Sequence, residues 1–322
     1  MTKAITVDTR TAPHRLVTSE VERPRAGVGE VVIDIASAGV NRADLLQVMG
    51  QYPSPAGWPQ WPGLEAAGVV AEVGESVTDF VVGQQVCALV GGGAYAEAIA
   101  VPADLVLPLP VGLDLIAAGG VMEAACTVWS NLAPHVPLHG GTLLVHGGSG
   151  GVGSLAVQLG VARGMRVFTT ARGAQRTARC RDELGADLAI DYTTTDFADV
   201  VAAEGGADVI LDVVGGPYLE ANLRALAPHG TVVVIGRQQG SLATLDLGAL
   251  MGGWATITGS TLRSRPHHQR AAIVADVHRE VWPLIPDLVA PVIDRVLPLE
   301  QAAQAHAAIR GGEVFGKIVL TP

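Results

Sequence analysis

An apolar strand runs through a glycine turn into a helix at Thr142-Leu-Leu-Val-His-Gly-Gly-Ser-Gly-Gly-Val-Gly-Ser154. The glycines have the spacing G-x-G-x-x-G, in which the first permits a tight turn, the second lets a pyrophosphate approach the backbone, and the third lets helix and strand pack closely. The helix start offers free N–H groups to phosphates. We therefore expect a dinucleotide site, with a ligand-free glycine turn as the alternative, at Gly148, Gly150, Gly151, Val152 and Gly153.

Helices and strands alternate after this turn. The pattern predicts helices at Val152–Arg163 and Ala174–Leu184, and strands at Arg166–Thr170, Leu188–Ile190, Asp208–Leu211, Thr231–Ile235 and Ala255–Thr258. Such alternation implies a parallel sheet with right-handed crossovers. The fold class expected here is α/β, a Rossmann doubly wound parallel sheet that binds its ligand at the carboxyl ends of the strands.

The chain before this region has a different pattern. Short β-like runs are broken by Gly and Pro at Val31–Ala36, Ala67–Val73, Gln85–Val90 and Tyr95–Val101. They predict a compact, mostly antiparallel β-barrel domain. The pattern becomes helical near Leu113–Ala118; after Arg265-Pro266, a helix is expected at Gln269–Leu284 and a strand at Ile318–Leu320. We expect domains at residues 1–121 and 122–262, with residues 263–322 returning to the first.

Composition limits the classes of partner. The chain has 322 residues, 49% of them hydrophobic, and a net charge of −10, which fits two well-buried domains. The sequence has no basic run, which argues against nucleic acid as the main partner. No apolar run is long enough to span a bilayer, and no signal-peptide core occurs. Three scattered cysteines fit a reducing cytoplasm.

Several motifs occur in a fixed order along the chain. They are Asn41-Arg-Ala-Asp-Leu-Leu46, Gly50-Gln-Tyr-Pro53, Gly63-Leu-Glu-Ala-Ala-Gly68, Gly91-Gly-Gly-Ala-Tyr-Ala-Glu97, the glycine turn and Gly316-Lys-Ile-Val-Leu320. With them the chain resembles the zinc-free quinone oxidoreductases of the medium-chain dehydrogenase/reductase superfamily. Ser260-Thr-Leu-Arg-Ser-Arg265 and Pro291-Val-Ile-Asp-Arg295 are similar to the tumour-suppressor-inducible quinone oxidoreductase branch. The resemblance implies a GroES-like catalytic domain, a Rossmann cofactor domain, NADPH and a homodimer.

The same resemblance raises the question of a metal. Zinc dehydrogenases of this architecture carry metal ligands at the positions of Asn41 and Leu64, and neither a carboxamide nor an isobutyl group supplies the N and S donors of such a site. The three cysteines are far apart in sequence, and His267-His268 is interpreted as a solvated turn. We expect a metal-free enzyme, which disfavours oxidation of unactivated alcohols.

The cofactor is predicted from the strand end Thr170-Ala-Arg-Gly-Ala-Gln-Arg176, which has two cations and no acid. An NAD site would place an acid there, whereas guanidinium groups suit a 2′-phosphate. The resemblance places Gly173 and Arg176 beside that phosphate, with Arg172 able to replace a missing hydroxyl, and Tyr192 beside the adenosine. Two merely solvated arginines are the alternative. Two further cofactor contacts are expected at Gly236 and Lys317, though Lys317 as a surface cation is an alternative.

Three polar residues match family positions near the nicotinamide. Asn41 is expected to bond the acceptor carbonyl or the carboxamide, Tyr52 to wall the pocket or donate its O–H, and Thr127 to fix the nicotinamide or a water. Each has a structural alternative, as turn residue, loop anchor and helix residue respectively. The leading function is NADPH-dependent quinone reduction. Reduction of activated alkenes (enals, enones or 2-enoyl thioesters) is the alternative, and a crystallin-like or RNA-binding role is a remote one. Ala255–Thr258 is the expected dimer edge.

Overall fold

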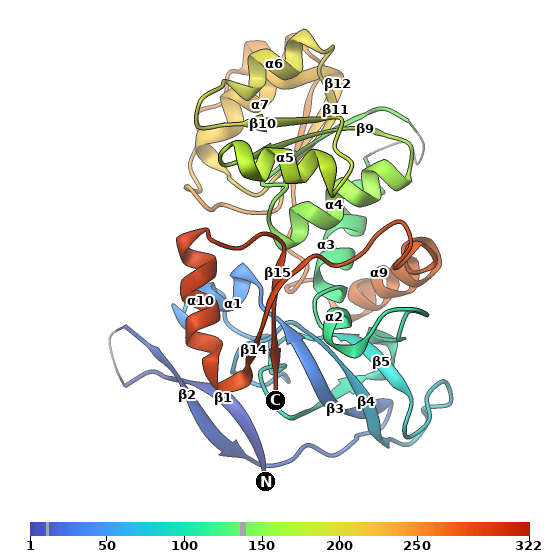
Figure 1. Ribbon diagram of the computed structural model, residues 1–322. Coiled ribbons are helices and arrows are strands. Elements are labelled where there is room, and N and C mark those ends of the chain that lie inside the picture. Colours follow the sequence, from blue (N-terminus) through green and yellow to red (C-terminus); the bar gives the residue numbers. More distant parts are fainter. Residues whose placement is uncertain (11–12, 136–139) are drawn as a thin grey trace. The chain divides into compact units, whose positions relative to one another are not determined.

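The computed structural model describes residues 1–10, 13–135 and 140–322 (Figure 1). Its internal contacts divide the chain into two compact units. The first comprises residues 1–126 and 263–322, and the second comprises residues 127–262. The division falls inside helix α3 (Met122–Leu132), so the two units share one continuous helix.

A six-stranded parallel sheet forms the centre of the second unit, in the order β10-β9-β8-β11-β12-β13. This is the strand order of a complete doubly wound nucleotide-binding domain, and it confirms the predicted fold class. The strands are β8 (Thr142–His146), β9 (Arg166–Ala171), β10 (Leu188–Asp191), β11 (Ala207–Asp212), β12 (Leu226–Val234) and β13 (Thr256–Gly259).

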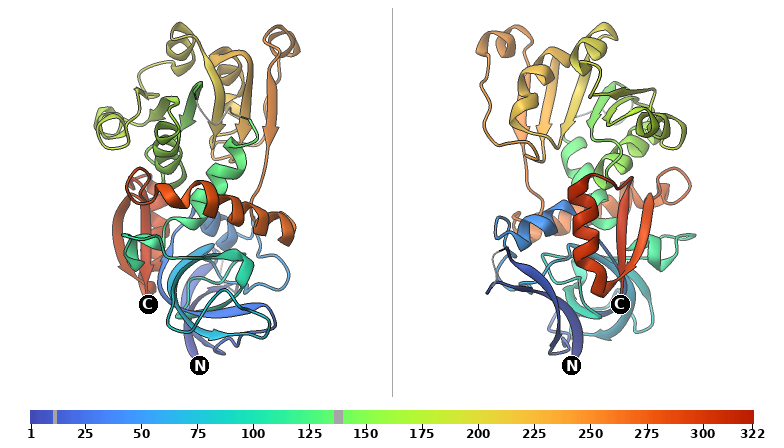
Figure 2. Two further views of the ribbon diagram at one scale, coloured as in Figure 1. Left: turned by 90° about the vertical axis from the view of Figure 1, so that its right-hand side faces the viewer. Right: turned by 60° about the vertical axis from the view of Figure 1, so that its left-hand side comes forward.

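Helices cover both faces of this sheet (Figures 1 and 2). Alternate residues of a strand face opposite sides. Leu143 and Val167 therefore meet α4 (Gly151–Ala162) at Gly160, whereas Leu144 and Phe168 join the core formed with α6 (Phe197–Ala203). The remaining helices of the unit are α5 (Ala174–Asp182), α7 (Leu219–Ala225) and α8 (Leu247–Gly252).

The first unit is built on a mostly antiparallel sheet in the order β14-β15-β3-β4-β5-β7, with β6 paired to β3. Strand β15 lies between β14 and β3, so the tail of the chain completes the sheet that the N-terminal part begins. The strands are β3 (Glu30–Gly39), β4 (Glu65–Val73), β5 (Gln85–Leu89), β6 (Ala98–Pro102), β7 (Val106–Pro108), β14 (Ile293–Pro298) and β15 (Lys317–Thr321). A separate hairpin joins β1 (Thr2–Asp8) and β2 (Arg15–Val21).

Some element ends differ from expectation. The run expected from Tyr95 is a strand only over Ala98–Pro102, because Tyr95 is a fully buried residue of the preceding loop. The helix expected to reach Leu284 is α9 (His267–Glu280) followed by the 3₁₀ turn η3 (Trp282–Leu284), since Pro283 cannot continue an α-helix. The hairpin β1–β2, helix α1 (Arg42–Val48) and helix α10 (Ala302–Gly311) are elements that the sequence analysis did not assign. Among the described residues, no helix is both long and apolar enough to cross a membrane.

Candidate functional site

Steric crowding requires glycine at two positions of the turn between β8 and α4. A Cβ on Gly148 would lie 2.0 Å from Thr169 Oγ1, and one on Gly153 would lie 2.1 Å from the Gly147 carbonyl oxygen. Both positions therefore exclude any side chain. A Cβ on Gly150 would meet nothing nearer than 3.4 Å, so that face of the turn is open for a ligand to approach. The crowding at Gly148 and Gly153 is the close packing expected from the spacing, and the approach of a pyrophosphate at Gly150 stays a prediction.

The start of α4 has no side-chain cap, because its N-cap residue is Gly150. In the described part of the chain, the N–H groups of Gly151, Val152 and Gly153 meet no backbone acceptor. A helix start normally finds partners for such groups in capping side chains, water or a ligand. Free N–H groups at the positive end of a twelve-residue helix suit a pyrophosphate.

A buried chain of hydrogen bonds supports this turn from behind. The Asp212 carboxylate accepts from Asn222 Nδ2 (3.0 Å), and the Asn222 amide oxygen pairs with His146 Nε2 (2.7 Å). His146 Nε2 must therefore carry the proton, which leaves Nδ1 to accept from the Thr170 hydroxyl (3.1 Å). Thr170 Oγ1 in turn accepts from the Gly147 N–H (3.3 Å). Burial lowers the pKa of His146, which favours this neutral tautomer.

Gly236 lies beside Asp212, the residue at the far end of these hydrogen bonds. Its N–H donates to the Asp212 carbonyl (3.2 Å), and a Cβ there would lie 2.6 Å from the Val213 carbonyl oxygen. The backbone therefore passes very close to the end of β11. The contact to a nicotinamide expected at Gly236 stays a prediction.

The loop after β9 holds the predicted phosphate residues. Arg172 is exposed, and its Nε donates to the Tyr192 hydroxyl (3.2 Å). Arg176 reaches back to Ser149 Oγ of the glycine turn (3.4 Å). Gly173 has a φ of 80°, a conformation that favours glycine, and its N–H donates to Asp191 Oδ1 (3.0 Å).

Asp191 is an acid at this loop that the sequence analysis did not anticipate, because it comes from the neighbouring strand β10. The same Oδ1 atom also accepts from the N–H and the hydroxyl of Thr193. These bonds lower the pKa of the Asp191 carboxyl. Its carboxylate is therefore engaged in shaping the loop.

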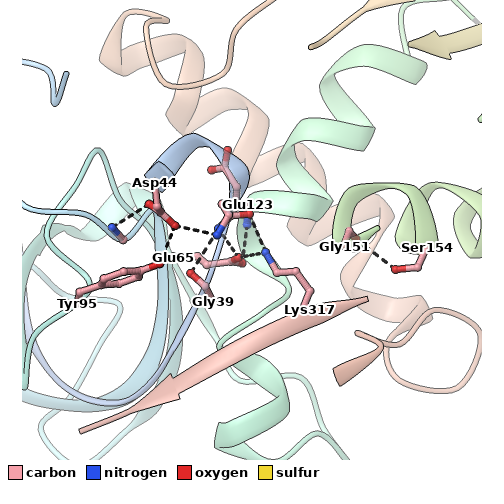
Figure 3. Close-up of polar contacts among 10 residues, drawn as sticks. Gly39, Asp44, Glu65, Tyr95, Glu123, Gly151, Ser154 and Lys317 are labelled. Atoms are coloured by element: carbon pink, nitrogen blue, oxygen red, sulfur yellow. Dashed lines mark hydrogen bonds and ion pairs between the residues drawn. The ribbon is translucent and has the colours of Figure 1, made fainter. Parts of the chain in front are cut away.

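In the first unit, a buried ion pair joins β4 and β15 (Figure 3). The Lys317 ammonium contacts Glu65 Oε1 and donates to Asn41 Oδ1 (2.7 Å), while Asn41 Nδ2 donates to Glu65 Oε1 (2.9 Å). Lys317 is only 3% exposed, so it is not a surface cation. The side chains of Asn41 and Lys317, which the sequence assigned separately to substrate and cofactor, bond each other here.

A second buried acid lies next to this pair. Asp44 accepts from the N–H groups of Asn41 (2.7 Å) and Gly63 (3.0 Å) and from the Tyr95 hydroxyl (3.1 Å). Because Tyr95 donates to Asp44, the His306 Nε2 at 3.2 Å must donate to the Tyr95 oxygen. Burial raises the pKa of Asp44 to about 6, and burial together with Arg310 lowers the pKa of His306 to about 4.

Tyr52 is held through its backbone and its ring by Arg263. The Arg263 guanidinium donates to the carbonyls of Tyr52 (2.9 Å) and Gly91 (2.7 Å), and it lies 5.0 Å from the centre of the Tyr52 ring. It also bonds Gln47 and Ser54. Burial and the charge of Glu123 raise the pKa of the Tyr52 phenol to about 12. The ring is thus fixed while its hydroxyl stays protonated.

Helix α3 supplies two partly exposed polar side chains, Glu123 and Thr127. The Glu123 N–H donates to Glu65 Oε2 (3.0 Å). Burial, followed by the negative charge of Glu65, raises the pKa of the Glu123 carboxyl to about 8. The Thr127 carbonyl accepts from Asn131 Nδ2 (2.8 Å), and its hydroxyl bonds no other residue in the described part of the chain.

The residues named above in the question of a metal do not come together in a metal-binding site. Leu64 is 1% exposed and packs in the core, and the Asn41 amide is occupied by Glu65 and Lys317. Within residues 1–10, 13–135 and 140–322, no three His, Cys, Asp or Glu side chains cluster as a metal-binding group. His267 and His268 open helix α9 instead of forming the expected turn, and His267 Nε2 bonds Asp104 Oδ2 (2.8 Å).

Four polar residues of the site were missed by the sequence analysis, although motifs contained most of them. Glu65 and Asp44 stand inside the quoted motifs Gly63–Gly68 and Asn41–Leu46, and Arg263 stands inside Ser260–Arg265. Glu123 is the single charge in the apolar run Val121-Met-Glu-Ala-Ala-Cys126. An isolated acid in such a run is the signal that would have found it.

Comparisons with known proteins agree with this architecture. Residues 27–111 match a family model described as the alcohol dehydrogenase GroES-like domain, and residues 184–320 match one described as zinc-binding dehydrogenase. The chain is 30% identical to a 2-haloacrylate reductase of a Burkholderia species, covering 100% of this chain and 99% of that protein. It is 32% identical to a mycocerosic acid synthase-like polyketide synthase of Mycolicibacterium smegmatis, of which it spans only 14%.

Solved structures share the fold over the whole chain. A quinone oxidoreductase of Pseudomonas syringae pv. Tomato DC3000 has a TM-score of 0.88 and 28% identity, with 100% of both chains covered. A mycobacterial protein solved in complex with NADPH has a TM-score of 0.86 and 27% identity, also with 100% of both chains covered.

Proposed function

Since the chain belongs to the medium-chain dehydrogenase/reductase superfamily, we propose that it is an oxidoreductase and that it reduces quinones with NADPH. One observation carries the cofactor part of the proposal: the uncapped start of α4 behind the Gly148–Gly153 turn, at the carboxyl end of a parallel sheet. The quinone part is supported by the similarity to a solved quinone oxidoreductase. When bound, NADPH supplies a hydride, and an acceptor needs only orientation and stabilisation of the charge that grows on its oxygen.

The cofactor assignment rests on the charges around the loop after β9. Arg176 bonds Ser149 of the glycine turn, and Arg172 lies in the same loop after β9. The acid at this loop, Asp191, is bonded to Gly173 and Thr193. The residues that would hold NADPH are the glycine turn for the pyrophosphate and these two arginines for the 2′-phosphate. A solved structure of the same fold with NADPH supports this choice.

We propose that the reaction needs no metal. The Leu64 side chain has no atom that can bind a metal. The Asn41 amide nitrogen donates to Glu65, and its amide oxygen accepts from Lys317. Activity is expected to survive prolonged chelation, with less than stoichiometric zinc by elemental analysis. A tightly held zinc whose removal abolishes turnover would contradict this proposal.

Activated alkenes are the second candidate, favoured by the full-length similarity to a 2-haloacrylate reductase. An acrylate has a C=C bond conjugated to a carboxyl group, so its β-carbon accepts a hydride while negative charge grows on a conjugated oxygen, as it also does on an oxygen of a quinone. The decisive experiment measures NADPH oxidation against a panel of quinones, enones and 2-haloacrylates. Quinones with the highest kcat/KM support the first candidate, and alkenes with the highest kcat/KM support the second. No turnover with any acceptor would defeat both.

The cofactor preference gives a first prediction. The double variant Arg172→Ala/Arg176→Ala removes two charge-assisted contacts, each contributing about 1.5–3 kcal/mol. We expect KM for NADPH to rise by about tenfold or more while KM for NADH changes little. Arg181→Ala on the same α5 helix is the matched control. Equal affinity of the unmodified protein for NADPH and NADH would rule out the assignment.

A further inference from the structure

Glu123 has a free carboxyl group beside a buried polar network. Its backbone N–H is tied to Glu65, but its carboxyl group makes no hydrogen bond to any residue that the structure describes. In Figure 3 the carboxyl group extends away from Glu65 and Lys317. It is also partly exposed. A partly exposed acid without a partner is available to a ligand.

Burial, together with the surrounding charges, sets the protonation state of Glu123. Burial and the negative charges of Glu65 and Asp44 raise its pKa, while Lys317 and Arg263 oppose the shift, and the resulting pKa is about 8. The carboxyl therefore carries its proton at neutral pH. The ionisable groups that interact with it come from several elements, namely Asp44 of α1, Glu65 of β4, Lys317 of β15, Cys126 of α3, Arg270 of α9, and Tyr52 and Arg263.

We propose that Glu123 is the acid that protonates the acceptor during reduction, an assignment that rests on the proposed function. In reduction of an enone, hydride from NADPH forms a C–H bond at the β-carbon, and the π electrons move to the carbonyl oxygen. The Glu123 O–H bond breaks, and its proton bonds to that oxygen. The carboxylate then recovers a proton from solvent. In a quinone, the hydride forms an O–H bond at one carbonyl oxygen, the π electrons move through the ring to the opposite carbonyl oxygen, and that oxygen takes the Glu123 proton to give the hydroquinone.

The neighbouring acids are less suited to this role. Asp44 accepts three hydrogen bonds, and Glu65 is paired with Lys317 and bonded to Asn41. Both are completely buried. The Tyr52 phenol has a pKa of about 12 and is a much weaker acid at neutral pH. A general acid works best with a pKa near the operating pH.

The test compares Glu123→Gln, Glu123→Asp and Glu75→Gln with the unmodified protein, using one enone and one quinone from about pH 6 to about pH 10. Glu75 is an exposed acid of the same unit and is the matched control. We expect kcat/KM of the unmodified protein and of Glu75→Gln to fall above about pH 8. In Glu123→Gln, kcat for the enone should fall by about 30-fold or more and this decline should disappear. The quinone, a better hydride acceptor, should lose less.

A second measurement needs no turnover. Infrared difference spectra of the protein without cofactor should show the C=O stretch of a protonated carboxyl that titrates near pH 8. This band should be absent from Glu123→Gln. Thermal denaturation and NADPH binding show whether Glu123→Gln folds. If it does not, Glu123→Asp provides the test: its kcat/KM should still fall with rising pH, and its kcat should be lower than that of the unmodified protein.

Several results would overturn the assignment. These are a kcat of Glu123→Gln within about threefold of the unmodified protein, a decline with pH that survives in this variant, or no titrating band in the unmodified protein. A loss of the decline in Glu123→Asp would also contradict it. An unmodified protein that reduces neither acceptor defeats the proposed function itself, whereas an active protein with an unaffected Glu123→Gln variant defeats only the role of Glu123.

Discussion

Lys317 and Glu65 form a fully buried ion pair, so each depends on the other for compensation of its charge. Removing one partner of such a pair typically costs about 3–5 kcal/mol, because the remaining charge stays buried and unpaired. Lys317→Met should therefore lower the free energy of unfolding by about this amount in chemical denaturation. The double variant Lys317→Met/Glu65→Leu should recover part of the loss.

The chain offers a natural control for this prediction. Lys3, its only other lysine, pairs with Glu300 at 3.3 Å on the surface, where both side chains are about half exposed. Such pairs contribute about 0–1 kcal/mol, so Lys3→Met should be nearly neutral. A Lys317→Met variant as stable as Lys3→Met would show that Glu65 does not carry a buried charge.

Tyr52 gives a second prediction at the residue scale. With its ring fixed by Arg263 and proton donation assigned to Glu123, we expect the phenol to shape the pocket. Tyr52→Phe should lower kcat by less than about threefold, and Tyr52→Ala should mainly raise KM for the acceptor. Steady-state kinetics with a quinone and an enone decide the matter. A drop in kcat of about tenfold or more in Tyr52→Phe would instead make its hydroxyl the donor to the developing charge.

Some features of single residues could be predicted from the sequence, and others could not. The glycine spacing was enough to predict the turn, because the steric limit at Gly153 comes from Gly147 in the same turn. The partners of Asn41 could not be predicted, because Glu65 and Lys317 lie 24 and 276 residues away. Asp191 was missed for the same reason: it reaches Gly173 only through the pairing of two strands.

At the scale of elements, the contact between α4 and the glycine turn depends on Gly153. Gly153→Ala places a Cβ 2.1 Å from the Gly147 carbonyl oxygen, so the helix must move away from the turn. We expect NADPH affinity, measured by fluorescence titration, to fall by about 100-fold or more, because the helix N–H groups lose their position. The melting temperature should also fall.

The control is a glycine with free space. A Cβ on Gly252 of α8 meets nothing within 4 Å, so Gly252→Ala should keep NADPH affinity and gain up to about 1 kcal/mol of helix stability. A Gly153→Ala variant with normal NADPH affinity would mean that the turn does not position the cofactor.

Element types were easier to predict than element ends. The parallel strands of the second unit were recognised because strands buried on both faces form continuous apolar runs. The hairpin β1–β2 was missed because β2 is largely polar and exposed. Helix α1 was also missed, since only seven residues form it and its start depends on a hydrogen bond from the Asn41 N–H to the Asp44 carboxylate.

For the whole molecule, we predict a homodimer formed through β13, one of the two edge strands of the parallel sheet. Large apolar side chains are exposed just before it, with Leu242 at 90%, Met251 at 73% and Trp254 at 66%. Sedimentation should give about twice the 33.1 kDa chain mass. Thr256→Lys/Met251→Lys should yield monomers, because charges on an edge strand oppose pairing.

The matched control for the dimer is Val111→Lys, which changes a highly exposed apolar residue of the other unit. This variant should sediment like the unmodified protein. A monomer at micromolar concentration before any substitution would contradict the dimer prediction.

The interrupted path of the first unit has a consequence for biosynthesis. Residues 127–262 leave the ribosome as one uninterrupted segment, whereas the first sheet waits for β15, which must enter between β14 and β3. Until Lys317 is translated, Glu65 lacks its cation. The first sheet thus stays incomplete through most of the synthesis of the chain. We infer that residues 127–262 fold before residues 1–126, although they are translated later. Translation of β15 then allows the first sheet to close.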